Sequence, residues 1–219
     1  MRTNPVLPRT SQPPPGDFRR LFDFLLSHHD EVLYLGLSRA VSGTLQAGES
    51  AAARAGAERI RVLDSRNASC GQGLLAERAA ELAREGLDAA AIAQRIEALL
   101  PRTQLYAYVR DLAHVVRGGR FPAWTLPITR WLGLVPVAKI GKDGKLHGAR
   151  VLRARADLPE RFARWLARQA DPAQRWRVLI GHAIANPIVP LTLARQDHRV
   201  LFNAGLSVQM HTYTTTHRI

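Results

Sequence analysis

The chain has 219 residues, of which 46% are hydrophobic and 22% charged, and its formal net charge is +13. This composition is typical of a globular protein with room for one large domain or two small ones. The single cysteine, Cys70, excludes an internal disulfide framework, and the lack of a long apolar run excludes a transmembrane helix. We therefore expect a cytoplasmic protein without a metal cluster.

The excess of arginine can indicate a nucleic acid or an anionic surface as a partner. The arginines, however, are scattered along Ala-rich segments and form no compact run. We interpret them as the solvated faces of helices. The sequence thus predicts no nucleic-acid partner and at most a transient contact with a membrane.

The first motif is Thr10-Ser11-Gln12-Pro13, which precedes an amphipathic helix predicted over residues 18–27. A hydroxyl pair and a rigid proline run thus lie just before a helix start. The sequence His-His-Asp at 28–30 follows this helix. Adjacent side chains do not converge easily on one metal ion, so we interpret these three residues as a polar turn.

Residues 31–37 are apolar and β-prone and predict a buried strand, whereas the Ala-rich residues 45–54 predict a helix. Ser42-Gly43-Thr44 should therefore lie where a strand ends and a helix begins. There the helix offers unpaired backbone N–H groups, and Gly43 lets a ligand approach the backbone closely. Such a site suits a carboxylate or a phosphate. An ordinary helix cap is the alternative, since Ser and Thr are the usual capping residues.

A second strand is predicted over residues 59–64, and a Gly-Gln-Gly sequence at 71–73 opens a helix predicted over 74–84. The full dinucleotide-binding fingerprint is absent. We expect these glycines either to allow close helix packing or to leave room for a ligand tail. Asp88 is the predicted cap of a further helix over 89–100.

Pro101 marks a predicted boundary between an N-terminal α/β domain, 1–102, and a C-terminal α/β domain, 103–219. The C-terminal domain is predicted to begin with a strand over 103–109, a short helix over 112–116 and a hairpin over 133–152 with its turn at Asp143-Gly144. A helix over 158–170 that buries Phe162, Trp165 and Leu166, a strand over 176–182 and a helix over 188–196 follow.

The order and spacing of the motifs resemble the DegV family of bacterial fatty-acid-binding proteins. Chains of that family carry T-S-Q-P-[SP]-x-[ED]-F and, about thirty residues later, S-x-x-x-S-G-T. The segment at 10–18 resembles the first pattern, with one residue more before its acidic position, and the segment at 38–44 matches the second. Further matches follow in order: Val62-Leu63-Asp64-Ser65, Gly71-Gln72-Gly73, Gly118-Gly119-Arg120, the hairpin over 136–152, and Ile180-Gly181-His182-Ala183.

The chain departs from the family pattern at both ends. DegV proteins normally begin with a strand ending in Asp-Ser, well ahead of T-S-Q-P, and nothing here corresponds to it. We expect either a truncated chain or a gene start further upstream. Near the C-terminus, His211 can be placed on the family's G-x-H-x-G-P-G segment, but Tyr213-Thr214-Thr215 replaces its Gly-Pro-Gly.

The resemblance implies a two-domain DegV-like α/β fold, with a parallel sheet in the N-terminal part and a mixed or antiparallel sheet in the C-terminal part. It implies a non-catalytic lipid-binding protein that holds a long-chain fatty acid and no cofactor. A separate kinase subunit would phosphorylate the bound fatty acid, and the product would feed phospholipid synthesis. The residues implied at the ligand are Thr10, Ser11, Ser42, Gly43, Thr44, Arg120 and His211.

Alternatives stay open for two of these residues and for the function as a whole. Arg120 could be a cation at a helix C-terminus, and His211 an exposed terminal residue. The alternative function is a serine-dependent hydrolase or acyl-transfer enzyme that uses Ser42. Ser42 lacks the G-x-S-x-G elbow, however, and the sequence places no acid–histidine pair beside it. We therefore favour fatty-acid binding, with Ser42 rather than Ser38 contacting the carboxylate.

Overall fold

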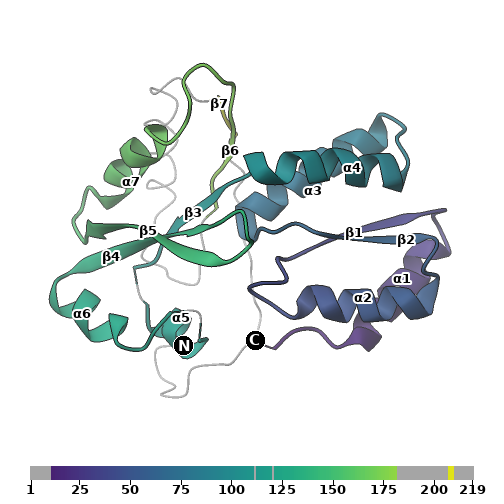
Figure 1. The fold of residues 1–219 in the computed structure, drawn as a ribbon, viewed down its shortest axis with the longest axis horizontal. Coiled ribbons are helices and arrows are strands. Elements are labelled where there is room, and N and C mark those ends of the chain that lie inside the picture. The colour runs from purple at the N-terminus through teal and green to yellow at the C-terminus, as the bar shows by residue number, and fades with distance from the viewer. Residues whose placement is uncertain (1–10, 111, 120, 182–206, 210–219) are drawn as a thin grey trace.

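The structure is a computed structural model that describes residues 11–110, 112–119, 121–181 and 207–209. The described chain forms two α/β halves that lie side by side along its longest axis (Figure 1). The first half holds a parallel pair of strands and the second an antiparallel sheet. The predicted fold class is therefore confirmed, whereas the domain boundary after residue 102 stays a prediction.

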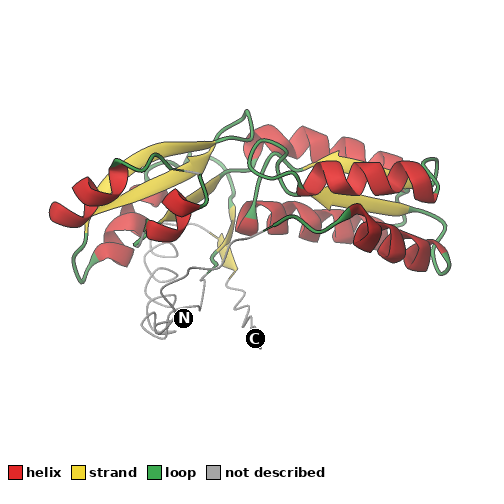
Figure 2. Cartoon of the chain, turned by 90° about the horizontal axis from the view of Figure 1, so that it is seen from below, coloured by secondary structure: helices red, strands yellow, loops and turns green. Residues whose placement is uncertain are grey.

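Helices cover both faces of the parallel sheet in the first half, which gives three layers (Figure 2). Val32 pairs with Ile60 at one end of this sheet, and Gly36 pairs with Asp64 at the other. The elements of this half are α1 (Pro15–Leu26), β1 (Val32–Gly36), α2 (Thr44–Ala55), β2 (Ile60–Asp64), α3 (Ser69–Arg84), α4 (Ala89–Leu99) and a 3-10 turn, η1 (Leu100–Arg102).

The two faces of this sheet bury separate apolar clusters. Ile60 faces α1 and α2, while Leu63 on the same strand faces α3 and α4, because successive strand residues point to opposite sides. Asp88 caps α4 as predicted, since its side chain accepts the Ala91 N–H at 2.7 Å. The cluster members are Phe22, Val32, Ala51, Ala52 and Ile60 on one face, and Leu63, Leu75, Leu82, Ile92, Ala93 and Ile96 on the other.

The second half is built on an antiparallel sheet with the strand order β3-β4-β5, and α7 packs on one of its faces. A short parallel pair, β6 and β7, lies beside it. The elements are β3 (Leu105–Tyr108), α5 (Ala113–Arg117), α6 (Thr125–Trp131), β4 (Leu134–Ile140), β5 (Leu146–Arg153), α7 (Leu158–Ala167), β6 (Arg177–Leu179) and β7 (Ser207–Gln209).

One prediction about α7 is wrong. Phe162, Trp165 and Leu166 are only partly buried. The most buried residues of the helix are Leu158 and Ala163, each 1% exposed, which belong to two separate apolar clusters. Phe162 and Trp165 pack against the cluster of Leu158, and Leu166 packs against Ala163.

Several element boundaries also differ from the prediction. Helix α1 begins at Pro15 rather than at residue 18, because the fixed φ of proline fits the first helical turn. Helix α3 begins at Ser69, so Gly71 and Gly73 lie inside it. The predicted helix over 188–196 lies outside the described residues.

A buried polar contact joins the two halves. The Ser38 hydroxyl, in the loop after β1, donates to the Gly144 carbonyl oxygen at 2.8 Å, and Ser38 is 1% exposed. Gly144 lies in the turn between β4 and β5 with φ +73°, where a side chain is strained and a Cβ would also crowd the Ser38 hydroxyl. The Asn67 amide Nδ2 makes a second link across the halves by donating to the Thr103 carbonyl oxygen at 3.2 Å.

Ser38→Ala should lower the free energy of unfolding by about 1–3 kcal/mol, because it leaves the buried Gly144 carbonyl without its donor. Urea denaturation of the two proteins measures this difference. Ser50→Ala on α2 is the matched control, since no side-chain hydrogen bond is recorded for Ser50 among the described residues. Equal losses for the two variants would contradict the assigned role of Ser38.

The turn at residue 144 carries its own ion pair. His147 Nε2 lies 2.9 Å from a carboxylate oxygen of Asp143, and the same carboxylate accepts the Lys145 N–H at 3.1 Å. The His147 hydrogen bond, and then the Lys145 N–H, lower the pKa of the Asp143 carboxyl. A carboxyl whose pKa is lowered by folding stabilises the fold above its unfolded pKa, and this contribution is lost as pH falls through the folded pKa.

Asp143→Asn should therefore destabilise the protein at pH 7 but not at a pH below the folded pKa of Asp143. Asparagine fits the same turn, so the substitution tests charge rather than turn geometry. Denaturation by urea across this pH range measures the effect. A stability difference that stays constant over the whole range would rule out the ion pair as its source.

Candidate functional site

The predicted strand–loop–helix unit is present at residues 32–55. Strand β1 ends at Gly36 and helix α2 begins at Thr44, with Gly43 as the residue before its first turn. The N–H groups of Val41 and Ser42 donate to the Ser38 carbonyl oxygen at 3.1 and 3.2 Å, which folds the loop into a tight turn. The buried Ser38 therefore fixes the position of Ser42.

The hydroxyls of this loop lie together at the start of α2. Ser42 Oγ and Thr44 Oγ1 are 2.8 Å apart, and Ser42 Oγ accepts the Thr44 N–H at 3.2 Å. Within the described part of the chain, the N–H groups of Leu45 and Gln46 have no recorded acceptor. The first turn of α2 also contains no acidic side chain. Hydroxyl and amide donors thus meet at the positive end of the helix dipole, where an anion is stabilised.

The simple capping alternative describes only part of this geometry. Gly43 occupies the cap position, and no side chain caps the helix there. Ser42 accepts one N–H, that of Thr44, while the N–H groups of Leu45 and Gln46 have no acceptor among the residues that the structure describes.

Gln12 brings the first motif to the same loop. Its side chain lies directly against Gly43, and a Cβ on Gly43 would overlap it. The segment around residues 11–13 therefore packs beside Ser42-Gly43-Thr44, although about thirty residues separate the two motifs. Sequence reasoning missed Gln12 as a site residue, although it stands inside the first motif.

The remaining predicted site residues divide into two groups. Ser11 is described and exposed, in the segment that leads into α1. Thr10, Arg120 and His211 lie outside the described residues, so their placement at the ligand stays a prediction. The two alternatives for Arg120 and His211 stay open for the same reason.

The Gly-Gln-Gly sequence has a packing role. A Cβ on Gly71 would overlap the Asn67 side chain, and one on Gly73 would lie 3.2 Å from Leu179. Gln72 Nε2 donates to the Leu35 carbonyl oxygen of β1 at 3.0 Å. These contacts favour the close-packing interpretation of the glycines.

The histidines after α1 form a turn. His28 Nδ1 lies 3.0 Å from the Phe24 carbonyl oxygen and 2.8 Å from Ser27 Oγ. In the described ranges, no three His, Cys, Asp or Glu side chains are grouped so that they could hold a metal ion. None of the described helices is long and apolar enough to cross a membrane.

The chain is similar in sequence to the members of one protein family. A family model described as an uncharacterised protein of the DegV family matches residues 1–217. A DegV domain-containing protein of Deinococcus radiodurans is 30% identical over 186 residues, which cover 83% of this chain and 65% of the relative. The chain thus spans somewhat less than two thirds of that relative's length.

Two solved structures share the fold. A DegV family protein from Thermus thermophilus, described by its fatty-acid binding, is 27% identical, with a TM-score of 0.73 over 96% of this chain and 74% of that chain. A DegV family protein from Eubacterium eligens loaded with heptadecanoic acid is 18% identical, with a TM-score of 0.78 over 96% of this chain and 75% of that chain. The predicted two-domain family fold is thereby confirmed.

Gly43→Ala should lower the free energy of unfolding by only about 0.5 kcal/mol, because the added methyl group overlaps the end of the exposed Gln12 side chain, which can move aside. In a Gln12→Ala background the same substitution should cost less, which gives a measurable coupling energy between the two positions.

Gly148→Ala on β5 is the control, since nothing lies within 4 Å of a Cβ there. Urea denaturation of the four proteins in the cycle provides the energies. A coupling energy of zero would show that Gln12 does not pack on Gly43 in solution.

Proposed function

Because the chain belongs to the DegV family, we propose that it binds a long-chain fatty acid, holds the carboxylate at Ser42-Gly43-Thr44 and presents it to a kinase for phosphorylation. The related structures that contain fatty acids support the class of ligand. The observation that carries the position of the carboxylate is the cluster of donors at the start of α2.

The chemistry of these donors suits a carboxylate. A carboxylate that leaves water loses strong hydration, which charge-assisted hydrogen bonds from hydroxyl and amide groups offset. The Ser42 hydroxyl and the N–H groups of Leu45 and Gln46 supply such bonds without a fixed positive charge. In this proposal Thr10, Arg120 and His211 complete the site from segments that are not described, and the Gln12 side chain closes the loop over Gly43.

The acyl chain supplies most of the affinity in this scheme, because each buried CH₂ group stabilises the complex by about 0.8 kcal/mol. The carboxylate instead determines the orientation of the bound fatty acid. Ser42, Gly43 and Thr44 are only half-buried, so a carboxylate bound there would lie close to the surface. This position would allow a second protein to reach it, as phosphorylation by a kinase requires.

Native mass spectrometry of the protein after bacterial expression tests the class of ligand. The proposal predicts a co-purifying mass that matches a long-chain fatty acid. Esterase turnover that disappears in Ser42→Ala, with no fatty acid retained by the parent protein, would instead establish the hydrolase alternative.

Ser42→Ala should weaken stearic acid binding by about tenfold or more, since a hydrogen bond to a charged group is worth about 1.5–3 kcal/mol. Isothermal titration calorimetry of the delipidated proteins gives the affinities, and Ser50→Ala on α2 serves as the control. Affinity in Ser42→Ala equal to that of the parent would place the carboxylate elsewhere.

A further inference from the structure

The net charge of the chain is distributed unevenly. Residues 1–102 contain 13 Lys and Arg against 12 Asp and Glu, whereas residues 103–219 contain 18 against 6. The first half is therefore almost neutral, and the second half carries nearly the whole charge of +13. Such asymmetry indicates that the second half meets an anionic partner.

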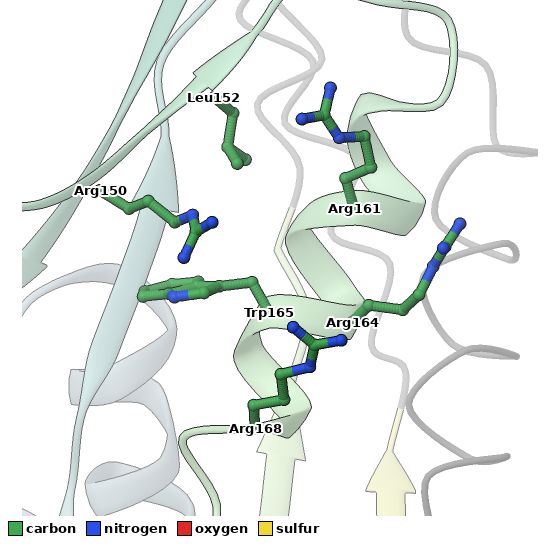
Figure 3. A pocket seen from close by; sticks show the side chains of 6 residues that line it. All are labelled: Arg150, Leu152, Arg161, Arg164, Trp165 and Arg168. Atoms are coloured by element: carbon green, nitrogen blue, oxygen red, sulfur yellow. The ribbon is translucent and has the colours of Figure 1, made fainter.

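Four arginines of the second half line one cavity. The cavity has a volume of about 170 Å³ and lies between β5 and α7 (Figure 3). Arg161, Arg164 and Arg168 approach it from α7, where their spacing puts them on neighbouring turns, and Arg150 approaches from β5. Arg150, Arg164 and Arg168 are exposed, as predicted for solvated side chains, but the structure brings them together at one place.

Among the described residues, most of these guanidinium groups have no carboxylate partner. Arg164 pairs with Glu160 at 3.2 Å, and in Figure 3 its side chain extends away from Trp165. For Arg150, Arg161 and Arg168, no carboxylate of the described residues lies within 4 Å. Arg39, Arg78 and Arg177 elsewhere in the molecule all pair with glutamates.

Apolar groups complete the cavity. Trp165 lies among the arginines, with the guanidinium groups of Arg150 and Arg168 near its indole ring (Figure 3). Leu152, which is 4% exposed, forms another part of the wall. The cavity wall is thus partly apolar, while the guanidinium groups of Arg150 and Arg168 stay exposed to solvent.

We propose that this cavity binds the phosphate group of a phosphorylated metabolite or of a lipid headgroup. Guanidinium is planar and presents paired N–H donors that match two phosphate oxygens, which a single ammonium group cannot do. Arg150, Arg161 and Arg168, which pair with no carboxylate of the described residues, can surround such a group. The cavity is of a size for a headgroup rather than an acyl chain. The site is separate from the loop over 38–44 and does not depend on the proposed fatty-acid binding.

The test compares the full-length parent with Arg150→Gln/Arg168→Gln and with the control Arg153→Gln/Arg155→Gln. The control removes the same charge from exposed arginines outside the cavity. Calorimetry at constant ionic strength measures binding of inorganic phosphate. Co-sedimentation measures binding to phosphatidylcholine vesicles with and without phosphatidic acid. Arg161→Gln provides a second cavity variant if the double variant does not fold.

The cavity variants should bind phosphate or phosphatidic acid vesicles about tenfold more weakly than the parent, and the control within about twofold of it. Binding of phosphate alone would assign a soluble phosphate ester, and binding of the vesicles would assign a lipid headgroup. Equal losses in the control and cavity variants would assign the effect to net charge and overturn the proposal. A parent protein that binds neither inorganic phosphate nor the phosphatidic acid vesicles would also overturn the proposal. Stearic acid binding should not change in any of these variants. If the phosphate proposal is overturned, the proposed fatty-acid site is therefore unaffected.

Discussion

The hydrogen bond from the Ser38 hydroxyl to the Gly144 carbonyl oxygen is the contact on which the arrangement of this molecule depends. Both groups are buried, so each needs a partner inside the protein. The bond fixes the turn between β4 and β5 against the loop that leaves β1, and the Ser38 carbonyl in turn holds Ser42. The position of the candidate ligand loop in the first half is thus coupled to the sheet of the second half. Asn67 reinforces the junction through Thr103 and through its carbonyl oxygen, which accepts the Ser38 N–H at 2.9 Å.

The two candidate anion sites use different chemistry. At the start of α2 the donors are a hydroxyl and backbone amides, which carry no net charge and suit an anion held mainly by an apolar tail. At the cavity between β5 and α7 the donors are guanidinium groups, and the surrounding half carries a large positive charge. A small phosphorylated ligand without an acyl chain has little apolar surface to bury, so its affinity must come from such charges. This difference in donor groups follows from the charge of the two halves, because the first half is almost neutral and the second is strongly basic.

Patterns of residues close together in the sequence predicted the helices, strands and turns well. The strand–loop–helix unit around Ser42, the cap at Asp88 and the turn at Asp143-Gly144 are all present, because each depends on residues close in sequence. The contacts of Ser38 with Gly144, of Gln12 with Gly43 and of Arg150 with the arginines of α7 join distant segments, and no local pattern specifies them. Trp165 was predicted to be buried because it lies on the apolar stripe of its helix, but it is only partly buried and packs against the cluster that contains Leu158. Ser42, Gly43 and Thr44 lie together at the start of α2, but their role at a ligand stays a prediction. Thr10, Arg120 and His211 fall outside the described residues.

The most direct test of the central claim is a titration of the isotopically labelled, delipidated protein with stearic acid, followed by the backbone amide resonances of Thr44, Leu45 and Gln46. If the carboxylate binds at the start of α2, these three resonances should show large shifts with stearic acid and much smaller ones with methyl stearate, which lacks the charge. Resonances of the residues that contact the acyl chain should shift with both stearic acid and methyl stearate. Stearic acid binding that leaves these three amides unchanged would contradict the claim that this loop holds the carboxylate.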